Sequence, residues 1–201
     1  IICDMGKRMR RIIKVDDSLM YALVEPGVTW QQLKLHLDEH HPKLKYGYTY
    51  APPHASVLAN SLLSGMSNLS TSYGCMADWL NGLEVILNDG SLVRTGSCFI
   101  SKEIKDDTWF TRYPIPDLSA LFTCWQGSTG IATKVAVQLW PKKPFNTVLV
   151  ALVYGPEECS ELVKEVGRTG CCEDVSAMNI EIIKMTFGQR NPPKYEKEPD
   201  F

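Results

Sequence analysis

Two stretches of small and polar residues carry the residue types that could hold a ligand against the backbone. The first runs from Ala51 to Gly65 and contains two prolines and three serines. The second reads Gln126-Gly-Ser-Thr-Gly130. Small residues let a backbone approach a ligand closely, and exposed N–H groups suit an anion or a polar ring. Taken alone, the second stretch favours a tight turn.

Individual polar side chains near these stretches leave their roles open. His54 is either a buried histidine with ordinary hydrogen bonds, the interpretation that the sequence favours, or a catalytic group beside a ligand. Asn60 either donates to a ligand or caps a turn. Glu84 lies among apolar neighbours on an alternating strand and is expected to face solvent. His36 and His40 are four residues apart, but no third ligand is evident, so a solvated helix end is favoured over a metal site.

The elements that would position these residues follow from hydrophobic periodicity. Residues 11–24 and 82–95 each predict a β-hairpin, the second around Asp89-Gly90. Thr29 and Gln32 form a capping-box pattern that begins a helix running to about Glu39. Further predictions are an extended segment over 46–50 with three tyrosines, a charged loop over 98–116, a short helix over 117–122 and a strand over 131–140.

The chain after Pro141 predicts a second, incomplete unit. Residues 147–154 and 175–183 read as strands, and residues 157–168 as an amphipathic helix with Leu162, Val163 and Val166 inside. This strand–helix–strand unit has no complete sheet of its own. The abrupt beginning and the polar end predict a piece of a longer protein.

Composition narrows the class of protein. The chain has 201 residues, 44% of them hydrophobic, and a net charge of −2, which gives no electrostatic case for nucleic acid. The sequence contains no run of about 18 apolar residues, so it predicts no membrane span. Seven cysteines, an odd number without a Cys-x-x-Cys pair, indicate neither a disulfide framework nor a zinc site. Reduced thiols in a cytoplasmic protein are expected.

Seven motifs in order resemble the FAD-binding oxidoreductases of the vanillyl-alcohol oxidase and p-cresol methylhydroxylase type. They are Asp4-Met-Gly-Lys-Arg-Met-Arg-Arg-Ile12, Val24-Glu-Pro-Gly-Val-Thr-Trp30, Ser56-Val-Leu-Ala-Asn60 with Gly65, Tyr73-Gly74, Gly82-Leu-Glu-Val85, Asn88 to Gly96, and Gly127-Ser-Thr-Gly-Ile131 with Thr133-Lys134 and Pro141. They cover about 140 residues.

The resemblance implies an α+β fold with FAD as the cofactor. Residues 1–144 would be the second subdomain of a PCMH-type FAD-binding domain, and residues 145–201 the beginning of an α+β substrate, or cap, domain. The segment matching the flavin and pyrophosphate loop is Pro53, His54, Ala55, Ser56 and Val57, continued by Asn60 and Gly65. The segment matching contacts to the adenosine end is Gln126, Gly127, Ser128, Thr129, Gly130, Ile131 and Ala132.

The resemblance also leaves the activity open within limits. It implies hydride transfer from an alcohol or hydroxy-acid carbon, with oxygen or a redox protein as electron acceptor, and leaves a homo-oligomer open. Phenol-oxidising members carry an aspartate just before the small-residue run, but residues 51–55 contain no acid, so no catalytic residue is assigned. The Gln126–Gly130 stretch is closer to lactate and glycolate dehydrogenases. The alternatives are a non-catalytic FAD-domain subunit completed by a partner chain and, more weakly, a cell-wall UDP-sugar reductase.

Overall fold

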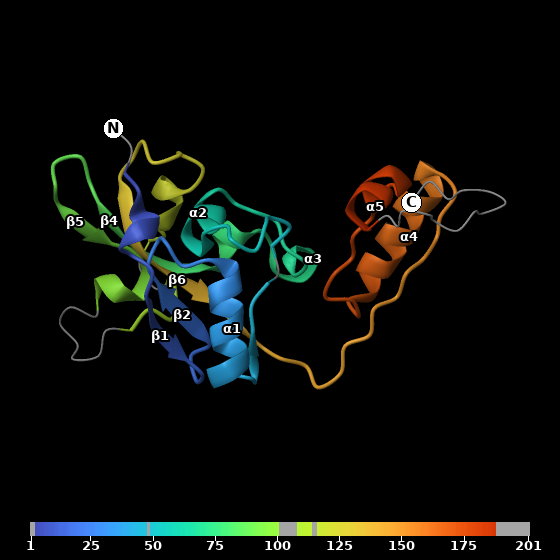
Figure 1. The fold of residues 1–201 in the computed structure, drawn as a ribbon, viewed down its shortest axis with the longest axis horizontal. Coiled ribbons are helices and arrows are strands. Elements are labelled where there is room, and N and C mark those ends of the chain that lie inside the picture. Colours follow the sequence, from blue (N-terminus) through green and yellow to red (C-terminus); the bar gives the residue numbers. More distant parts are fainter. Residues whose placement is uncertain (1–2, 48, 101–107, 114–115, 188–201) are drawn as a thin grey trace. The chain divides into compact units, whose positions relative to one another are not determined.

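The protein divides into two compact units, Ile1–Lys143 and Pro144–Phe201 (Figure 1). The computed structural model describes residues 3–47, 49–100, 108–113 and 116–187. Each unit is described by itself below. The assignment of residues 1–144 to an FAD-binding domain and of residues 145–201 to a substrate domain stays a prediction.

A five-stranded antiparallel sheet forms the centre of the first unit (Figure 1). Both predicted hairpins are present, one made by β1 and β2 and the other by β4 and β5. The strand from the later part of the chain, β6, inserts between the hairpins and pairs with β2 and β4. The order across the sheet is β1 (Ile12–Asp16), β2 (Tyr21–Val24), β6 (Ile131–Gln138), β4 (Leu80–Ile86) and β5 (Leu92–Arg94).

Two helices contribute to the core on one face of this sheet. The first, α1 (Trp30–His40), begins with the predicted capping box. Thr29 Oγ1 accepts a hydrogen bond from the Gln32 N–H at 3.2 Å, and Gln32 Oε1 accepts one from the Thr29 N–H at 3.0 Å. The second, α2 (Val57–Leu62), follows the Pro-rich loop. Their buried side chains join those of the sheet in one cluster that includes Trp30, Leu33, Leu37, Val57, Leu58, Val24, Leu83 and Val135.

Shorter elements complete the first unit and refine two predictions. The strand expected over 131–140 breaks at Leu139, so β7 (Trp140–Pro141) leaves the main sheet and pairs with β3 (Leu44–Lys45). The helix expected over 117–122 is the shorter 3₁₀ helix η4 (Ser119–Phe122). The remaining elements are η1 (Met5–Lys7), α3 (Ser70–Tyr73), η2 (Met76–Trp79) and η3 (Gly96–Phe99).

The described tyrosines of the 46–50 segment, Tyr46 and Tyr50, lie in different surroundings. Tyr46 is buried and stacks on Trp30 with ring centroids 5.3 Å apart, whereas Tyr50 is exposed. Tyr48 lies outside the described residues. Tyr46 therefore belongs to the core, as ordinary packing predicts.

The second unit contains the predicted helix but not the predicted strands. Helix α4 (Pro156–Thr169) covers the expected 157–168, with proline in its first turn and Gly170 following at φ +64°. Residues 147–154 form no strand, and helix α5 (Ile180–Phe187) takes up the end of the second expected strand, from Ile180 to Ile183. These apolar runs have strand propensity, but a strand also needs a neighbour for its hydrogen bonds, and the described residues of this unit offer none.

The prediction that Leu162, Val163 and Val166 face inward on α4 is also wrong. Leu162 and Val163 are 39% and 36% exposed, and Val166 is half-buried, whereas the helix buries Cys159. The apolar side of this helix therefore remains largely uncovered within the described residues.

None of the described helices has the length and apolar character to cross a membrane. All seven cysteines are free thiols.

Candidate cofactor-binding site

A groove of about 440 Å³ opens between the segment before β1, the turn before α1 and the loop before α2. Two of its lining side chains, His54 and Ser56, belong to the segment that the sequence predicts to contact a cofactor. The full lining is Asp4, Gly6, Lys7, Arg10, Pro26, Gly27, Thr29, His54 and Ser56. The loop over 53–57 thus meets two other segments that sequence reasoning did not assign to a site.

The charge of this groove suits an anion. Lys7 and Arg10 contribute two cations and Asp4 one carboxylate, so the lining carries a formal charge of +1 with His54 neutral. Asp4 is already engaged, because its carboxylate accepts from the Gly6 N–H at 3.1 Å and lies 3.7 Å from the Lys7 ammonium. Arg10 has no ion pair within the described part of the chain. Its guanidinium can therefore meet an incoming anion without first leaving a partner.

Close backbone approach builds the floor of the groove at Gly27. A β-carbon on Gly27 would lie 2.6 Å from the Met9 carbonyl oxygen and 2.9 Å from the Gly6 α-carbon. The Gly27 N–H also donates to that Met9 oxygen at 2.7 Å. A side chain at this position would push the Lys7–Arg10 segment away, so glycine is what holds the cations against the groove.

The loop over 53–57 is pinned to the start of α1. Trp30 and Gln31 donate their N–H groups to the carbonyl oxygens of Ala55 and Pro53, at 3.1 and 2.9 Å. The N–H groups of Ala55 and Val57 are paired within the protein as well. Within the described residues, no hydrogen bond engages the N–H groups of His54 and Ser56, which leaves these two for a ligand.

His54 is exposed, contrary to the buried histidine that the sequence favoured. The two prolines before it hold the loop at the surface, and its side chain lines the groove instead of packing inside. Ser56 has a structural task as well, because its hydroxyl donates to the Pro26 carbonyl oxygen at 2.5 Å and caps α2 at the Ala59 N–H.

Asn60 and Gly65 brace the other end of α2. Asn60 Oδ1 accepts from Trp30 Nε1 at 3.1 Å and from Thr49 Oγ1 at 2.8 Å. A β-carbon on Gly65 would lie 2.5 Å from Asn60 Nδ2. These contacts tie the turn after α2 to α1, and they account for both residue types without a ligand. Their predicted contact with a cofactor stays a prediction.

The second predicted segment, 126–132, does not line the groove, and the turn that precedes it is joined to the end of α2. The Cys124 N–H donates to the Leu62 carbonyl oxygen at 2.7 Å, which joins the two turns. Gln126, Gly127 and Ser128 are exposed, Thr129 and Gly130 are half-buried, and Ile131 and Ala132 begin β6. A β-carbon on Gly127 would meet nothing within 4 Å, whereas one on Gly130 would lie 2.6 Å from Val85 Cγ1. Gly130 is therefore required by strand packing.

Backbone strain gathers in these two joined turns. Among the described residues, four other than glycine have a positive φ, and three of them are Ser64, Cys124 and Gln126, at 56°, 60° and 51°. Such conformations cost roughly 1–3 kcal/mol each and cluster where a ligand is held. Helix α2, about 9 Å long at 1.5 Å per residue, separates this strained pair of turns from the groove. An elongated ligand could reach both.

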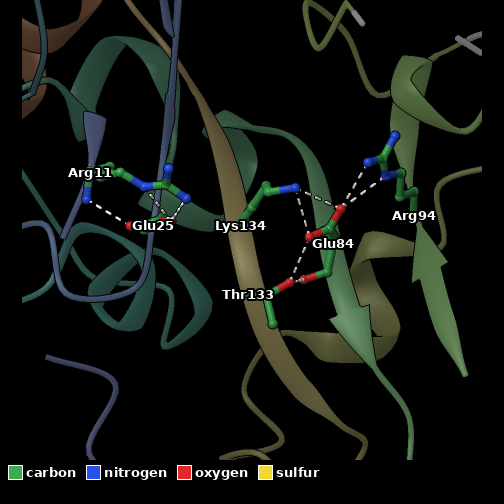
Figure 2. A network of polar contacts seen from close by, with 6 residues as sticks. All are labelled: Arg11, Glu25, Glu84, Arg94, Thr133 and Lys134. Atoms are coloured by element: carbon green, nitrogen blue, oxygen red, sulfur yellow. Dashed lines mark hydrogen bonds and ion pairs between the residues drawn. The ribbon is translucent and has the colours of Figure 1, made fainter. Parts of the chain in front are cut away.

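A buried network of charges connects β4, β5 and β6 (Figure 2). Sequence reasoning missed this network. Glu84 is 5% exposed, not solvent-facing as expected. Its carboxylate accepts from Lys134 Nζ at 3.0 Å, from Arg94 Nε at 3.0 Å and from Thr133 Oγ1 at 2.9 Å. Glu84 lies directly across from Arg94 on β5 and from Lys134 on β6, so the sheet register makes the network.

A second buried carboxylate, Glu25, extends the charged row (Figure 2). It accepts from Arg11 through the backbone N–H at 2.8 Å and through Nε at 3.0 Å. The hydrogen bond from the Arg11 side chain is the main reason that the pKa of Glu25 is lowered, with Lys134 contributing at longer range. Burial alone would raise the pKa of Glu84, but hydrogen bonds from Lys134, Thr133 and Arg94 outweigh it and lower that pKa. Both side chains are carboxylates at neutral pH.

Comparison with known proteins defines the class of this fold. A family model described as an FAD binding domain matches residues 1–96. The chain is 34% identical over 154 residues to the 4-cresol dehydrogenase [hydroxylating] flavoprotein subunit of Pseudomonas putida, covering 74% of this chain and 28% of that protein. It is 30% identical over 166 residues to glycolate oxidase subunit GlcD of Bacillus subtilis, covering 80% and 32%. The chain thus spans about three tenths of the length of these relatives.

A solved structure gives the same class. The crystal structure of p-cresol methylhydroxylase with substrate bound superimposes with a TM-score of 0.65 at 29% identity, over 80% of this chain and 30% of that one. Fold and matches together indicate an FAD-binding domain. The chain belongs to the FAD-binding proteins of the p-cresol methylhydroxylase type, and its cofactor is FAD.

The residues of the groove fit the central part of this cofactor. The pyrophosphate of FAD is an anion with many acceptor oxygens, and the groove offers Lys7, Arg10 and the N–H groups of His54 and Ser56. The Gly27 floor lets the backbone come close. Lys7 and Arg10 could have been proposed from the sequence, because the motif beginning at Asp4 is basic, but nothing in the sequence places it beside His54.

Proposed function

We propose that this chain is the FAD-binding part of an oxidoreductase that oxidises an alcohol or hydroxy-acid carbon. The observation that carries the proposal is the cationic groove at His54 and Ser56, built on a glycine floor in a chain of this family. When bound, FAD supplies the acceptor for two electrons. The residues of this chain hold the cofactor and orient it.

Each set of residues has a separate task in this proposal. Lys7 and Arg10 neutralise the pyrophosphate, and the N–H groups of His54 and Ser56 donate to its oxygens. The joined turns around Leu62 and Cys124 hold a more distant part of the same cofactor. The hydrogen bonds from Trp30 and Gln31 keep the 53–57 loop in place, so the groove is preformed and little order is lost on binding.

The substrate belongs to one of two classes that the relatives suggest. The Pseudomonas putida relative is named for 4-cresol, and the Bacillus subtilis relative for glycolate. We therefore propose a phenolic alcohol or alkylphenol, or a 2-hydroxy acid. Oxygen or a redox protein would take up the electrons, a homo-oligomer is compatible with this proposal, and the free thiols suit the cytoplasm.

A titration of the apoprotein with FAD tests the proposal. The full-length protein should bind FAD and quench its fluorescence, and a phenolic alcohol or a 2-hydroxy acid should bleach the flavin absorption. Lys7→Gln and Arg10→Gln should each weaken FAD binding about 10-fold, because hydrogen bonds to charged groups contribute about 1.5–3 kcal/mol. Added salt should reduce the difference in FAD affinity between these variants and the wild type, because salt screens the charges of Lys7 and Arg10.

Lys164→Gln, on the exposed side of α4, is the matched control and should leave FAD affinity unchanged. A full-length protein that binds no FAD would overturn the proposal. FAD bound without bleaching by either substrate class would instead support a non-catalytic FAD-domain subunit, completed by a partner chain.

A further inference from the structure

Three of the four histidines of the chain gather at the C-terminal end of α1. The ring centroid of His36 lies 4.7 Å from that of His40 and 5.7 Å from that of His41. Helix α1 has 11 residues and is therefore about 16 Å long. Thr29, which lines the cofactor groove, precedes the opposite end of the helix, so the histidine cluster lies outside the groove.

His36 and His40 lie one helical turn apart on the same face of α1. Residues four apart in a helix are neighbours, and two imidazoles at this spacing can bind a single zinc ion. His36 is half-buried, and the His40 side chain is 52% exposed. An ion can therefore reach the pair from solvent. The sequence favoured a solvated helix end here, but the structure shows that the two rings already meet.

His41 is engaged with a different element. It follows the last residue of α1, and its Nδ1 lies 2.5 Å from Asp17 Oδ2. This contact joins the end of α1 to the turn after β1. Among the described residues, no three histidine, cysteine or carboxylate side chains are arranged to hold a metal ion. A metal ion at this place therefore has two protein ligands, and water occupies its remaining positions.

The charges around the pair favour a cation. The C-terminal end of a helix carries a partial negative charge. Glu39 Oε2 also lies 3.7 Å from His40 Nε2. The pKa of His36 is lowered, first by burial and then by the neighbouring His40 and His41. Its imidazole is therefore neutral at neutral pH and offers a lone pair to a metal ion.

We propose that His36 and His40 bind a divalent transition-metal ion of the class to which Zn²⁺ belongs. Imidazole suits zinc, copper and nickel, whereas Mg²⁺ and Ca²⁺ prefer oxygen ligands. The ion links two successive turns at the end of α1, the same end that His41 and Asp17 join to the first hairpin. Because the ion binds the folded chain, it stabilises this part of the fold. The site requires neither FAD nor turnover.

A zinc titration of the full-length protein, without a histidine tag, tests the proposal. NMR correlation of the ring nitrogens and carbon-bound protons observes each imidazole separately, and coordination changes the chemical shift of the bound nitrogen. The exposed thiols are first alkylated under native conditions, because cysteine also binds zinc. The signals of His36 and His40 should shift together and saturate. The signals of His54, and all signals with Mg²⁺ in place of Zn²⁺, should stay unchanged.

Glutamine variants assign the ligands. His36→Gln and His40→Gln should each weaken zinc binding at least about 10-fold in calorimetry, because each removes one of two ligands. His41→Gln is the matched control, since it removes a histidine from the same helix end, and should change the affinity less than about 2-fold. Zinc should raise the urea midpoint of the wild type and of His41→Gln, but not that of His40→Gln. If His36→Gln does not fold, His40→Gln carries the test, because that side chain is exposed.

Three results would overturn the proposal. The first is no saturable zinc binding up to about 1 mM after alkylation of the exposed thiols. The second is equal zinc affinity in the wild type, His36→Gln and His40→Gln. The third is a loss in His41→Gln as large as that in His40→Gln, which would assign the ion to a different set of histidines. Shifts with Mg²⁺ equal to those with Zn²⁺ would indicate screening of charge instead of coordination, and would overturn it as well.

Discussion

Replacing Glu84 with glutamine should destabilise the protein by about 2–3 kcal/mol at neutral pH. The change keeps the shape of the side chain but removes the charge that faces Lys134 and Arg94. Breaking a buried ion pair typically costs about 3–5 kcal/mol, and an exposed pair contributes about 0–1 kcal/mol. The Glu84 side chain is 7% exposed, but those of Lys134 and Arg94 are 27% and 18% exposed. The two cations can recover some hydration, so an intermediate value is expected.

The pH dependence supplies the sign of this effect. The pKa of Glu84 is lowered in the folded protein, so its contribution is fully present above the unfolded pKa of about 4.3 and is lost as pH falls through the folded pKa. The wild type should lose this increment below about pH 4, whereas Glu84→Gln has no carboxyl group at this position to titrate. The two free energies of unfolding should therefore converge in acid.

Urea unfolding followed by far-UV circular dichroism measures the loss of stability at pH 7 and its disappearance near pH 3. At pH 7 the midpoint of Glu84→Gln should fall by about 1 M, with a similar slope. Glu39→Gln, at an exposed position of α1, should stay within about 0.5 kcal/mol of the wild type. A difference below about 0.5 kcal/mol at pH 7, or one that grows as the pH falls, would show that the sheet does not depend on this carboxylate.

Three further substitutions test other parts of the structure. Thr29→Ala removes one half of the capping box and should lower the free energy of unfolding by about 1 kcal/mol in urea titrations, whereas Thr29→Ser should restore it. Gly65→Ala places a β-carbon 2.5 Å from Asn60 Nδ2 and should cost about 1–3 kcal/mol, measured the same way; an unchanged midpoint would mean that the turn after α2 yields freely. Gly27→Ala should displace the Lys7–Arg10 segment and weaken FAD binding about 10-fold in fluorescence titrations, whereas Gly167→Ala on α4, where a β-carbon meets nothing, should leave FAD binding unchanged.

Sequence patterns between neighbouring residues predicted the hairpins and the start of α1 in the first unit. They could not predict which strands distant in sequence pair with one another. Asp89-Gly90 predicted the β4–β5 hairpin, and the Thr29–Gln32 pattern predicted the start of α1, because each depends on residues close in sequence. The hairpin register could also have placed Arg94 opposite Glu84. The contribution of Lys134 could not be predicted, since nothing local says that β6 lies beside β4. In the second unit, the runs over 147–154 and 175–183 resembled strands, but propensity without a neighbouring strand did not produce them.

The same limit applies to the candidate site. The small-residue loop around His54 pointed to a ligand through its residue types alone. The cations that complete the groove lie more than 40 residues earlier, and the glycine that holds them, Gly27, contacts them only in the folded chain. Charge and close backbone approach at this site are products of tertiary structure, so sequence reasoning found one wall of the groove and missed the other.

The position of β6 has a consequence for how the chain acquires its structure during synthesis. The two hairpins, 11–24 and 80–94, can each close soon after they leave the ribosome, because their strands are neighbours in sequence. They cannot join, because the strand between them spans Ile131–Gln138, and Tyr21 must wait for Gln138, its partner in the register. Until then β2 and β4 each present an unpaired edge. The interval in which β6 is still being translated is therefore the period when a nascent chain is most exposed to pairing with another copy, and the period when a chaperone would matter most.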